Sequence, residues 1–253
     1  MLAWAIDLDG VVWRGAETVP GAPEAVARLR RADCPIAFVT NSALRTPDQV
    51  GVKLADHGIP DATDLVITSA MAAASLIEED EKVVMIGSDG LRGAIEDRKA
   101  TVVEEGPADA VIVGLSYSFD YADMTRAMEA IRGGARFIAT NDDSTFPDAD
   151  RLLPGNGAIV AAVATAAGVA PVIAGKPHET ISAMVRARLG TNGIMVGDRP
   201  ETDGSFARTI GYQFGLVLTG VTSIADLPVS PSPDIVEPDL ATLVDVILGP
   251  GLG

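Results

Sequence analysis

The sequence predicts an α/β protein in which a parallel β-sheet is covered by helices. Short runs of β-branched and other apolar residues alternate with amphipathic stretches of helical period almost from end to end. The runs are apolar throughout rather than alternating, which is typical of strands buried on both faces. With 253 residues, of which 47% are hydrophobic, the chain is long enough to bury a sizeable core.

Five apolar runs are expected to form the strands of the main sheet, with helical stretches between them. The helix after the second run has a clear start. Thr46 is suited to the N-cap, Pro47 to the first helical position, and Gln49 to closing a capping box with Thr46. The five predicted strands cover residues 3–8, 35–40, 65–68, 194–197 and 214–219.

The middle of the chain carries a further set of short strands and helices, which indicates an inserted domain. An acidic run at 78–81 and a turn at 168–171 mark its two ends. We therefore expect a core made of residues 1–80 and 173–253, interrupted by an inserted domain of residues 81–172. The predicted elements of the insertion are strands at 83–86, 102–103, 110–113 and 137–139 and helices near 91–98 and 121–132.

The composition excludes several classes of protein. The 19 basic and 35 acidic residues give a net charge of −16, which argues against nucleic-acid binding. A single cysteine, Cys34, excludes an internal disulfide, and with only two histidines no ordinary zinc site is expected. We expect a cytoplasmic location, because the first residues do not read as a signal peptide. Gly168 and Pro171 divide the uncharged stretch 158–175, so no membrane span is expected.

Polar side chains follow four of the predicted strands, at the point where each strand ends. In an open parallel sheet, ligands bind outside the carboxyl ends of the strands. Because parallel strands end at the same edge, we expect these side chains to converge there. The converging residues are Asp7 and Asp9, Thr40 and Asn41, Lys176, and Asp198.

Carboxylates that converge in this way repel one another unless a cation compensates them. Oxygen ligands without histidine or cysteine suit Mg²⁺, which binds through one or two carboxylates and a phosphate oxygen. Lys176 supplies a point charge for a phosphate group, and the hydroxyl of Thr40 is a neutral donor for its other oxygens. The residues therefore predict a Mg²⁺ site that receives a phosphate.

Four motifs, in order, resemble those of the haloacid dehalogenase superfamily of phosphohydrolases, and within it the NagD-like branch (class IIA). The first is DLDGVVWRG at residues 7–15, the second VTNSALRTP at 39–47, the third AGKP at 174–177 and the fourth GDRPETD at 197–203. The resemblance extends over nearly the whole chain, including LVLTGVT at 216–222. It implies a Rossmann-like core with an α/β cap domain inserted between the second and third motifs.

The resemblance also implies roles for individual residues. Asp7 would be the nucleophile that forms an aspartyl phosphate, and Asp9 the acid and base for the leaving group and for water. Mg²⁺ would be held by Asp7, the backbone carbonyl of Asp9 and Asp198, with Asp203 in support. Thr40, Asn41 and Lys176 would bind the phosphoryl oxygens. Ser42 stands where relatives commonly carry a second asparagine.

We therefore expect a Mg²⁺-dependent phosphatase acting on small phosphate monoesters such as sugar or aryl phosphates. A nucleotidase or a phosphoglycolate phosphatase on the same scaffold is the main alternative, and a non-enzymatic phospho-accepting regulator is a further one. The expected partner is a small phosphorylated metabolite, with neither nucleic acid nor membrane involved, and a homodimer is left open. By resemblance, the specificity candidates are Asn141, Asp142, Asp143 and residues 155–157.

Overall fold

The computed structural model describes residues 2–148 and 151–249 and confirms the α/β class. The chain forms two compact units. The first contains the residues up to 40, residues 50–67 and the residues from 176 onward. The second contains residues 41–49 and 68–175, and so begins before the inserted domain that the sequence predicts.

The first unit is built on a six-stranded sheet in the order β15-β14-β13-β1-β4-β5. β1 pairs in parallel with β13 and with β4, and β14 pairs in parallel with β13 and with β15. The strands are β1 (Ala3–Ile6), β4 (Ile36–Thr40), β5 (Val66–Thr68), β13 (Gly193–Gly197), β14 (Gln213–Val217) and β15 (Ile235–Glu237).

The register of this sheet positions the ends of its central strands. Ile6 of β1 is paired with Val196 of β13 on one side and with Phe38 of β4 on the other. From β1 the chain proceeds to β4, and only much later does it return to form β13 on the opposite side. The end of β1 is therefore a topological switch point, the usual ligand position in an open α/β sheet, and Asp7 follows directly.

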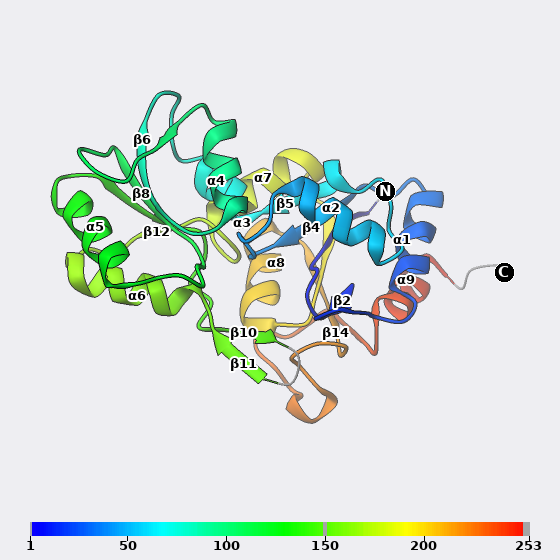
Figure 1. Cartoon of the computed structure of the whole chain (residues 1–253). Helices are drawn as coiled ribbons and strands as arrows, with labels where there is room; N and C mark the ends of the chain where they lie inside the picture. The colour runs from blue at the N-terminus through cyan, green and yellow to red at the C-terminus, as the bar shows by residue number, and fades with distance from the viewer. Residues whose placement is uncertain (1, 149–150, 250–253) are drawn as a thin grey trace. The chain divides into compact units, whose positions relative to one another are not determined.

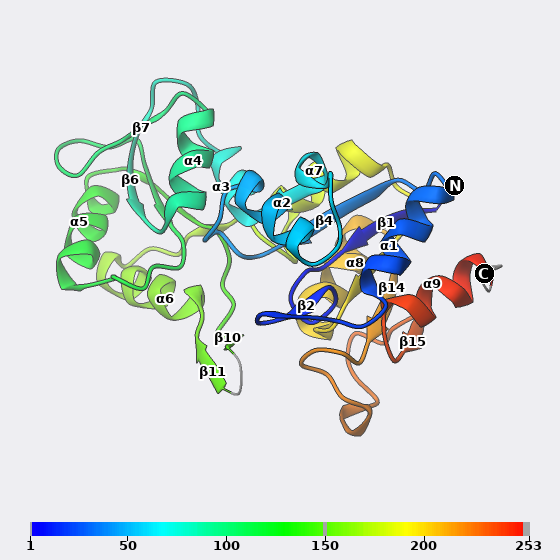
Figure 2. The ribbon, with the colours of Figure 1, turned by 45° about the vertical axis from the view of Figure 1, so that its right-hand side comes forward.

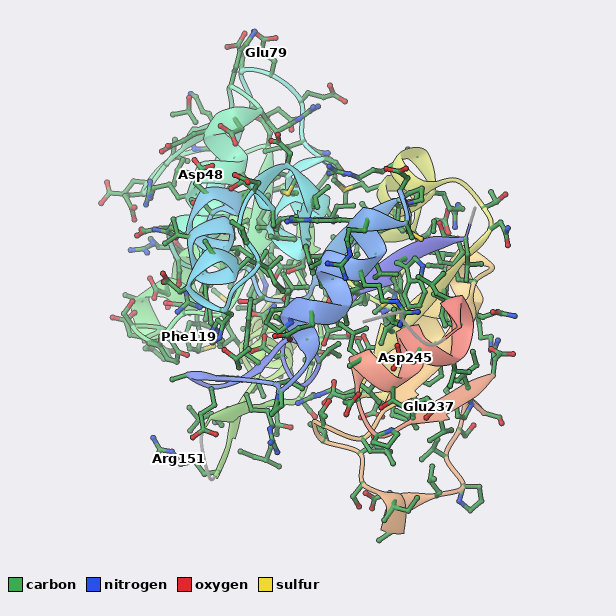
Figure 3. All side chains as sticks on the ribbon, turned by 90° about the vertical axis from the view of Figure 1, so that its right-hand side faces the viewer. Asp48, Glu79, Phe119, Arg151, Glu237 and Asp245 are labelled. Carbon is green, nitrogen blue, oxygen red and sulfur yellow. The ribbon has the colours of Figure 1, made fainter. Side chains whose placement is uncertain are left out.

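Helices cover both faces of the first sheet. α1 and α9 lie side by side (Figure 2), where Arg28 forms an ion pair with Asp245, which is labelled on α9 in Figure 3. Beneath them, Trp4, Leu29 and Leu243 belong to one buried apolar cluster. The helices are α1 (Ala22–Arg31), α2 (Pro47–Asp56), α7 (Glu179–Leu189), α8 (Ser205–Ile210) and α9 (Leu240–Leu248); β2 (Trp13–Arg14) and β3 (Glu17–Thr18) form a short antiparallel hairpin.

The second unit has its own five-stranded sheet, in the order β12-β9-β8-β6-β7. α5 and α6 pack together on this sheet (Figure 1), with Ile131, Phe137 and Val163 in their shared apolar core. The elements are α3 (Ser69–Ala74), β6 (Lys82–Ile86), α4 (Asp89–Asp97), β7 (Thr101–Val102), β8 (Ala110–Val113), α5 (Tyr121–Arg132), β9 (Arg136–Ala139), the hairpin β10 (Thr145–Asp148) and β11 (Arg151–Pro154), α6 (Asn156–Ala167) and β12 (Val172–Ile173).

Every strand that the sequence predicts is present, most with ends shifted by one or two residues. β15 and the strands of both hairpins were not predicted, because they are only two to four residues long. The proline-rich segment before β15 also lacks the sequence pattern of a strand. In the uncharged stretch 158–175, α6 ends at Gly168, where φ is +74°, and β12 follows. No helix within residues 2–148 and 151–249 is both long and apolar enough to cross a membrane.

The predicted start of α2 is confirmed by reciprocal hydrogen bonds. The backbone N–H of Gln49 donates to the Thr46 hydroxyl at 3.3 Å, and the backbone N–H of Thr46 donates to Oε1 of Gln49 at 3.0 Å. We expect Thr46→Ala to lower the free energy of unfolding by about 1 kcal/mol, because the first turn then loses its side-chain acceptor. Thr46→Ser should retain most of the stability. Urea denaturation of both variants checks this, and equal losses would contradict it.

Candidate active site at the carboxyl ends of the strands

Lys176 lies at the centre of a buried ionic cluster in the first unit. Its side chain is 2% exposed, and its Nζ donates to Oδ1 of Asp7 at 2.6 Å and to Oδ1 of Asp203 at 2.8 Å. α7 begins only at Glu179, so Lys176 is not a surface lysine of that helix. The predicted convergence of Asp7, Lys176 and Asp198 is therefore found, with Asp203 added to it.

The cluster contains more negative than positive charge. Burial raises the pKa of Asp7 well above its ordinary value, and the nearby Asp203 and Asp198 add to this against the opposing effect of Lys176. Burial likewise raises the pKa of Asp198 to about 7, with Asp203 contributing. Burial alone would lower the pKa of Lys176, but the two carboxylates that it contacts raise it above the ordinary value. The lysine is therefore charged. Arg199 also acts to lower the pKa of Asp198, but burial and Asp203 outweigh it.

Asp198 follows β13 and is held by the segment after β14. Its Oδ2 accepts a hydrogen bond from the backbone N–H of Val221 at 2.6 Å, and its backbone carbonyl accepts one from the Thr222 hydroxyl at 2.6 Å. A Cβ on Gly220 would lie 1.9 Å from Oδ2 of Asp198, and a Cβ on Gly10 would lie 2.4 Å from it. Both positions therefore require glycine for the loops to approach the carboxylate this closely.

Asp203 reaches the cluster through an unusual turn. Residues Pro200–Gly204 form one π-helical turn immediately after β13. The turn brings Oδ2 of Asp203 to the backbone N–H of Arg199, at 3.1 Å, and leaves Oδ1 to accept from Lys176. Asp203 is 1% exposed, so it is an interior anchor for the lysine rather than an ordinary acid of a helix N-terminus.

The donor set fits a divalent cation. Asp7, Asp198 and Asp203 each offer one carboxylate oxygen, and these atoms lie within 4.8 Å of one another. Oδ1 of Asp198 is buried and accepts no hydrogen bond from any described residue, which is costly for a carboxylate oxygen unless a cation binds it. Oxygen ligands alone, without histidine or cysteine, favour a hard ion such as Mg²⁺.

The other predicted site residues have different surroundings. Thr40 is buried at the end of β4, the strand next to β1. Asn41 is assigned to the second unit, where its Nδ2 donates to Oδ2 of Asp143 at 3.0 Å. Asp9 is exposed, and its Oδ1 accepts a hydrogen bond from Nε1 of Trp13 at 2.8 Å.

Among the specificity candidates of the second unit, Asn141, Gly155 and Asn156 are buried, whereas Asp142 is exposed. Asn156 is buried, and its Nδ2 donates to the backbone carbonyl of Asn141 at 2.7 Å. A Cβ on Gly155 would lie 2.1 Å from the carbonyl oxygen of Asp143, and one on Gly157 would lie 2.4 Å from that of Asp142. Asn156 thus ties segments together inside the unit, and its part in specificity stays a prediction.

Residues that support the site were missed by sequence reasoning. Gly220, Val221 and Thr222 hold Asp198, and the Thr219 hydroxyl donates to the carbonyl of Gly10 at 2.6 Å. The available signal was the Thr-Gly-Val-Thr sequence directly after an apolar strand, which places small and polar residues at the same sheet edge.

We expect Gly220→Ala to displace the Asp198 carboxylate and to reduce activity toward a phosphate ester about 100-fold, the order of effect of a 1 Å misplacement in an active site. Gly93→Ala in α4 is the control, because its Cβ would have only a side-chain methyl of Thr46 near it, at 3.2 Å. Steady-state kinetics on both variants checks this. Full activity of Gly220→Ala would contradict the assigned geometry.

Comparison with known proteins identifies the family. Residues 4–100 match the model of a family described as haloacid dehalogenase-like hydrolase, and residues 173–243 match one described as HAD-hydrolase-like. The 5'-nucleotidase YutF of Bacillus subtilis is 40% identical over 225 residues, which are 87% of this chain and 88% of that protein. An acid sugar phosphatase of Staphylococcus epidermidis is 36% identical over 89% of each chain.

A solved structure of a phosphatase is similar to this chain over nearly its whole length. The glycerol phosphate phosphatase of Mycobacterium tuberculosis, in complex with magnesium, matches with a TM-score of 0.87 and 35% identity. The match covers 95% of this chain and 75% of that one. These relationships extend over enough of each chain to fix the family, and the predicted resemblance is confirmed: this chain belongs to the haloacid dehalogenase-like hydrolases, in the NagD-like branch of phosphatases.

Proposed function

We propose that this protein is a Mg²⁺-dependent phosphatase that hydrolyses small phosphate monoesters in two steps through an aspartyl phosphate on Asp7. The proposal rests on the buried cluster of Lys176 with Asp7 and Asp203, and on Oδ1 of Asp198, which has no hydrogen-bond partner among the described residues. A nucleophile, a fixed cation and a free metal-ligand oxygen converge at the switch point of the sheet. Such a site suits phosphoryl transfer, in which positioning and charge neutralisation supply most of the catalysis.

In the first step, a carboxylate oxygen of Asp7 bonds to phosphorus while the bond from phosphorus to the leaving oxygen breaks. Asp9 gives its proton to that leaving oxygen. In the second step, Asp9 accepts a proton from water as the water oxygen bonds to phosphorus and the Asp7–phosphorus bond breaks. Both residues then return to their starting states, so the cycle balances.

The phosphoryl oxygens would be bound by Lys176, the hydroxyl of Thr40 and the side chain of Asn41. The charge on Lys176 is secured by its raised pKa, so it is available at any physiological pH. Its two carboxylate contacts hold the ammonium group in a fixed place. A lysine that is both charged and immobile stabilises the charge of the transferring group without reorganisation.

Mg²⁺ would be held by Asp7, the backbone carbonyl of Asp9 and Asp198, with Asp203 in support. When bound, it neutralises the charge that the carboxylates and the phosphate bring together. The glycerol phosphate phosphatase of Mycobacterium tuberculosis was solved in complex with magnesium and also with calcium, which supports a divalent cation at this site. The excess negative charge of the cluster provides independent support.

We infer that the second unit acts as a cap that restricts the substrate to small metabolites. The relatives point to different substrates, since one is a 5'-nucleotidase and another an acid sugar phosphatase. The 40% identity to the nucleotidase makes a nucleoside monophosphate the second candidate substrate. Comparing kcat/KM for sugar phosphates, nucleoside monophosphates and phosphoglycolate would separate the candidates. A phospho-accepting regulator would instead stop near one phosphate per chain.

The single Cys34 is buried, and a chain without an internal disulfide suits a reducing compartment, so we propose a cytoplasmic location. The proposed partner is a small phosphorylated metabolite.

We expect chelation to abolish activity and Mg²⁺ to restore it. Ca²⁺ should support turnover about 10- to 100-fold more slowly, because the larger ion accepts more ligands at longer distances and loosens the attack geometry. Initial rates with p-nitrophenyl phosphate after exhaustive chelation and metal addition measure this. Full activity of the chelated enzyme would end the metal assignment.

Substitutions of the two catalytic aspartates should impair different steps of the reaction. Asp7→Asn should form no phosphoenzyme with any substrate. Asp9→Asn should still transfer phosphate from p-nitrophenyl phosphate, because that leaving group needs little protonation. With an alkyl phosphate, the rate of the first step should fall by roughly 10²- to 10⁴-fold. Because the second step still needs a base, this variant should release about one p-nitrophenol per site in a burst.

Rapid acid quench measures the burst, and peptide mass spectrometry locates the phosphoryl group. A label on a residue other than Asp7 would overturn the nucleophile assignment. Equal losses with aryl and alkyl substrates, without a burst, would overturn the role of Asp9 and leave Asp7 untouched.

A further inference from the structure

The side chain of Asp9 is held by Trp13, to which the reaction described above assigns no part. Nε1 of Trp13 donates to Oδ1 of Asp9 at 2.8 Å. A tight turn makes this contact, since the N–H of Gly10 donates to the carbonyl of Trp13 at 2.7 Å and Asp9 forms a β-bridge with Trp13. Asp9 is exposed whereas Trp13 is 3% exposed, so a rigid buried ring holds a carboxyl group that faces solvent.

Further contacts fix the indole ring itself. The His57 ring stacks on it with centroids 5.0 Å apart, and Nζ of Lys53 lies 4.0 Å from its centroid. Thr18 is the partner of Trp13 across the β2-β3 hairpin, and its hydroxyl lies 2.7 Å from Nδ1 of His57 in a hydrogen bond. The ring is therefore fixed by both the hairpin and the end of α2, and it cannot rotate without breaking these contacts.

This arrangement has a chemical consequence for Asp9. An indole N–H is only a donor, so the oxygen that it contacts must be an acceptor. In a protonated carboxyl group the carbonyl oxygen is a stronger acceptor than the hydroxyl oxygen, so the bond from Trp13 to Oδ1 favours the proton on Oδ2. Without that bond, an exposed carboxyl group would distribute over several rotamers, and either oxygen could carry the proton.

We propose that Trp13 is a positioning residue that selects Oδ2 of Asp9 as the proton-transferring oxygen and holds it in one place. Thr18, His57 and Lys53 support it by fixing the indole. This proposal rests on the proposed function, in which Oδ2–H gives its proton to the leaving oxygen and Oδ2 later takes one from water. Trp13 itself exchanges no proton and acts through Asp9.

The hydrogen bond can be tested without activity. The chain has two tryptophans, so the indole region of a ¹H–¹⁵N spectrum of the full chain contains two signals. Trp13→Phe identifies the Trp13 signal by its loss, and Trp4→Phe identifies the other. We expect Asp9→Asn to shift the Trp13 signal and leave that of Trp4 in place. An unmoved Trp13 signal would overturn the proposal, even if Trp13→Phe failed to fold, because Trp4→Phe would still assign the peaks.

The catalytic consequence is measured with kcat/KM, which reports the first step and is independent of the slow hydrolysis of the intermediate. Trp13→Phe keeps an aromatic ring and removes the N–H. We expect it to lower kcat/KM for an alkyl phosphate about tenfold or more, and to change that for p-nitrophenyl phosphate little. The dependence of the rate on leaving-group pKa should become steeper. Trp4→Phe, a matched change in the core of the same unit, should leave the dependence unaltered.

A double variant separates positioning from a general loss of structure. In an Asp9→Asn background, Trp13→Phe should cause no further loss with the alkyl substrate, because the group that it positions is already absent. Equal losses for alkyl and aryl substrates, or additive losses in the double variant, would show that Trp13 is only structural. If the wild type hydrolyses no phosphate ester, the proposed function is wrong. If the wild type does so and Asp9→Asn loses activity mainly with alkyl esters, a negative result for Trp13→Phe contradicts only the role of Trp13.

Discussion

A buried ammonium group between two carboxylates organises the strand ends of the first unit. Lys176 contacts Asp7 at the end of β1 and Asp203 in the turn after β13, and so joins the two neighbouring strands of the switch point. Lys176 and Arg199 do not offset the burial of three acids: burial raises the pKa values of Asp7 and Asp198, and the neighbouring carboxylates raise them further. The excess negative charge favours the binding of a divalent cation, and a bound cation in turn favours the binding of an anionic substrate. A protein of net charge −16 can thus bind phosphate, because the local field differs from the global one.

Much of this could be predicted from the sequence, for identifiable reasons. Fully apolar runs reveal strands buried on both faces, and a parallel sheet brings their ends to one edge. Asp7, Lys176 and Asp198 come directly after or beside such runs, so their convergence follows from topology without knowledge of any contact. The helix start at Thr46 was equally accessible, because a capping box is a local interaction.

The remaining features depend on geometry that periodicity does not encode. The burial of Asp203 requires a π-helical turn, which no 3.6-residue pattern signals. Val221 holds Asp198 from 23 positions away in the sequence, and His57 stacks on Trp13 from 44 positions away. The burial of Asn156 could not be predicted from its sequence neighbours. Gly155 and Gly157 pack against the backbone carbonyl groups of Asp143 and Asp142, which belong to another segment. In each case the sequence shows the residue, and the tertiary contact supplies its role.

If the strand-end carboxylates bind a divalent cation, ion binding must be linked to the release of protons. Titration calorimetry with Mg²⁺ in two buffers of different ionisation enthalpy gives the number of protons released per ion bound. Because the pKa of Asp198 is about 7 without metal, Mg²⁺ should displace about one proton from Asp198 near pH 6 and fewer as the pH rises above 8. Asp198→Asn should weaken binding and lower the number of protons released, and any remaining release would come from Asp7, whose pKa is also raised. Binding without proton release near pH 6, or unchanged affinity in Asp198→Asn, would show that these carboxylates do not form the cation site.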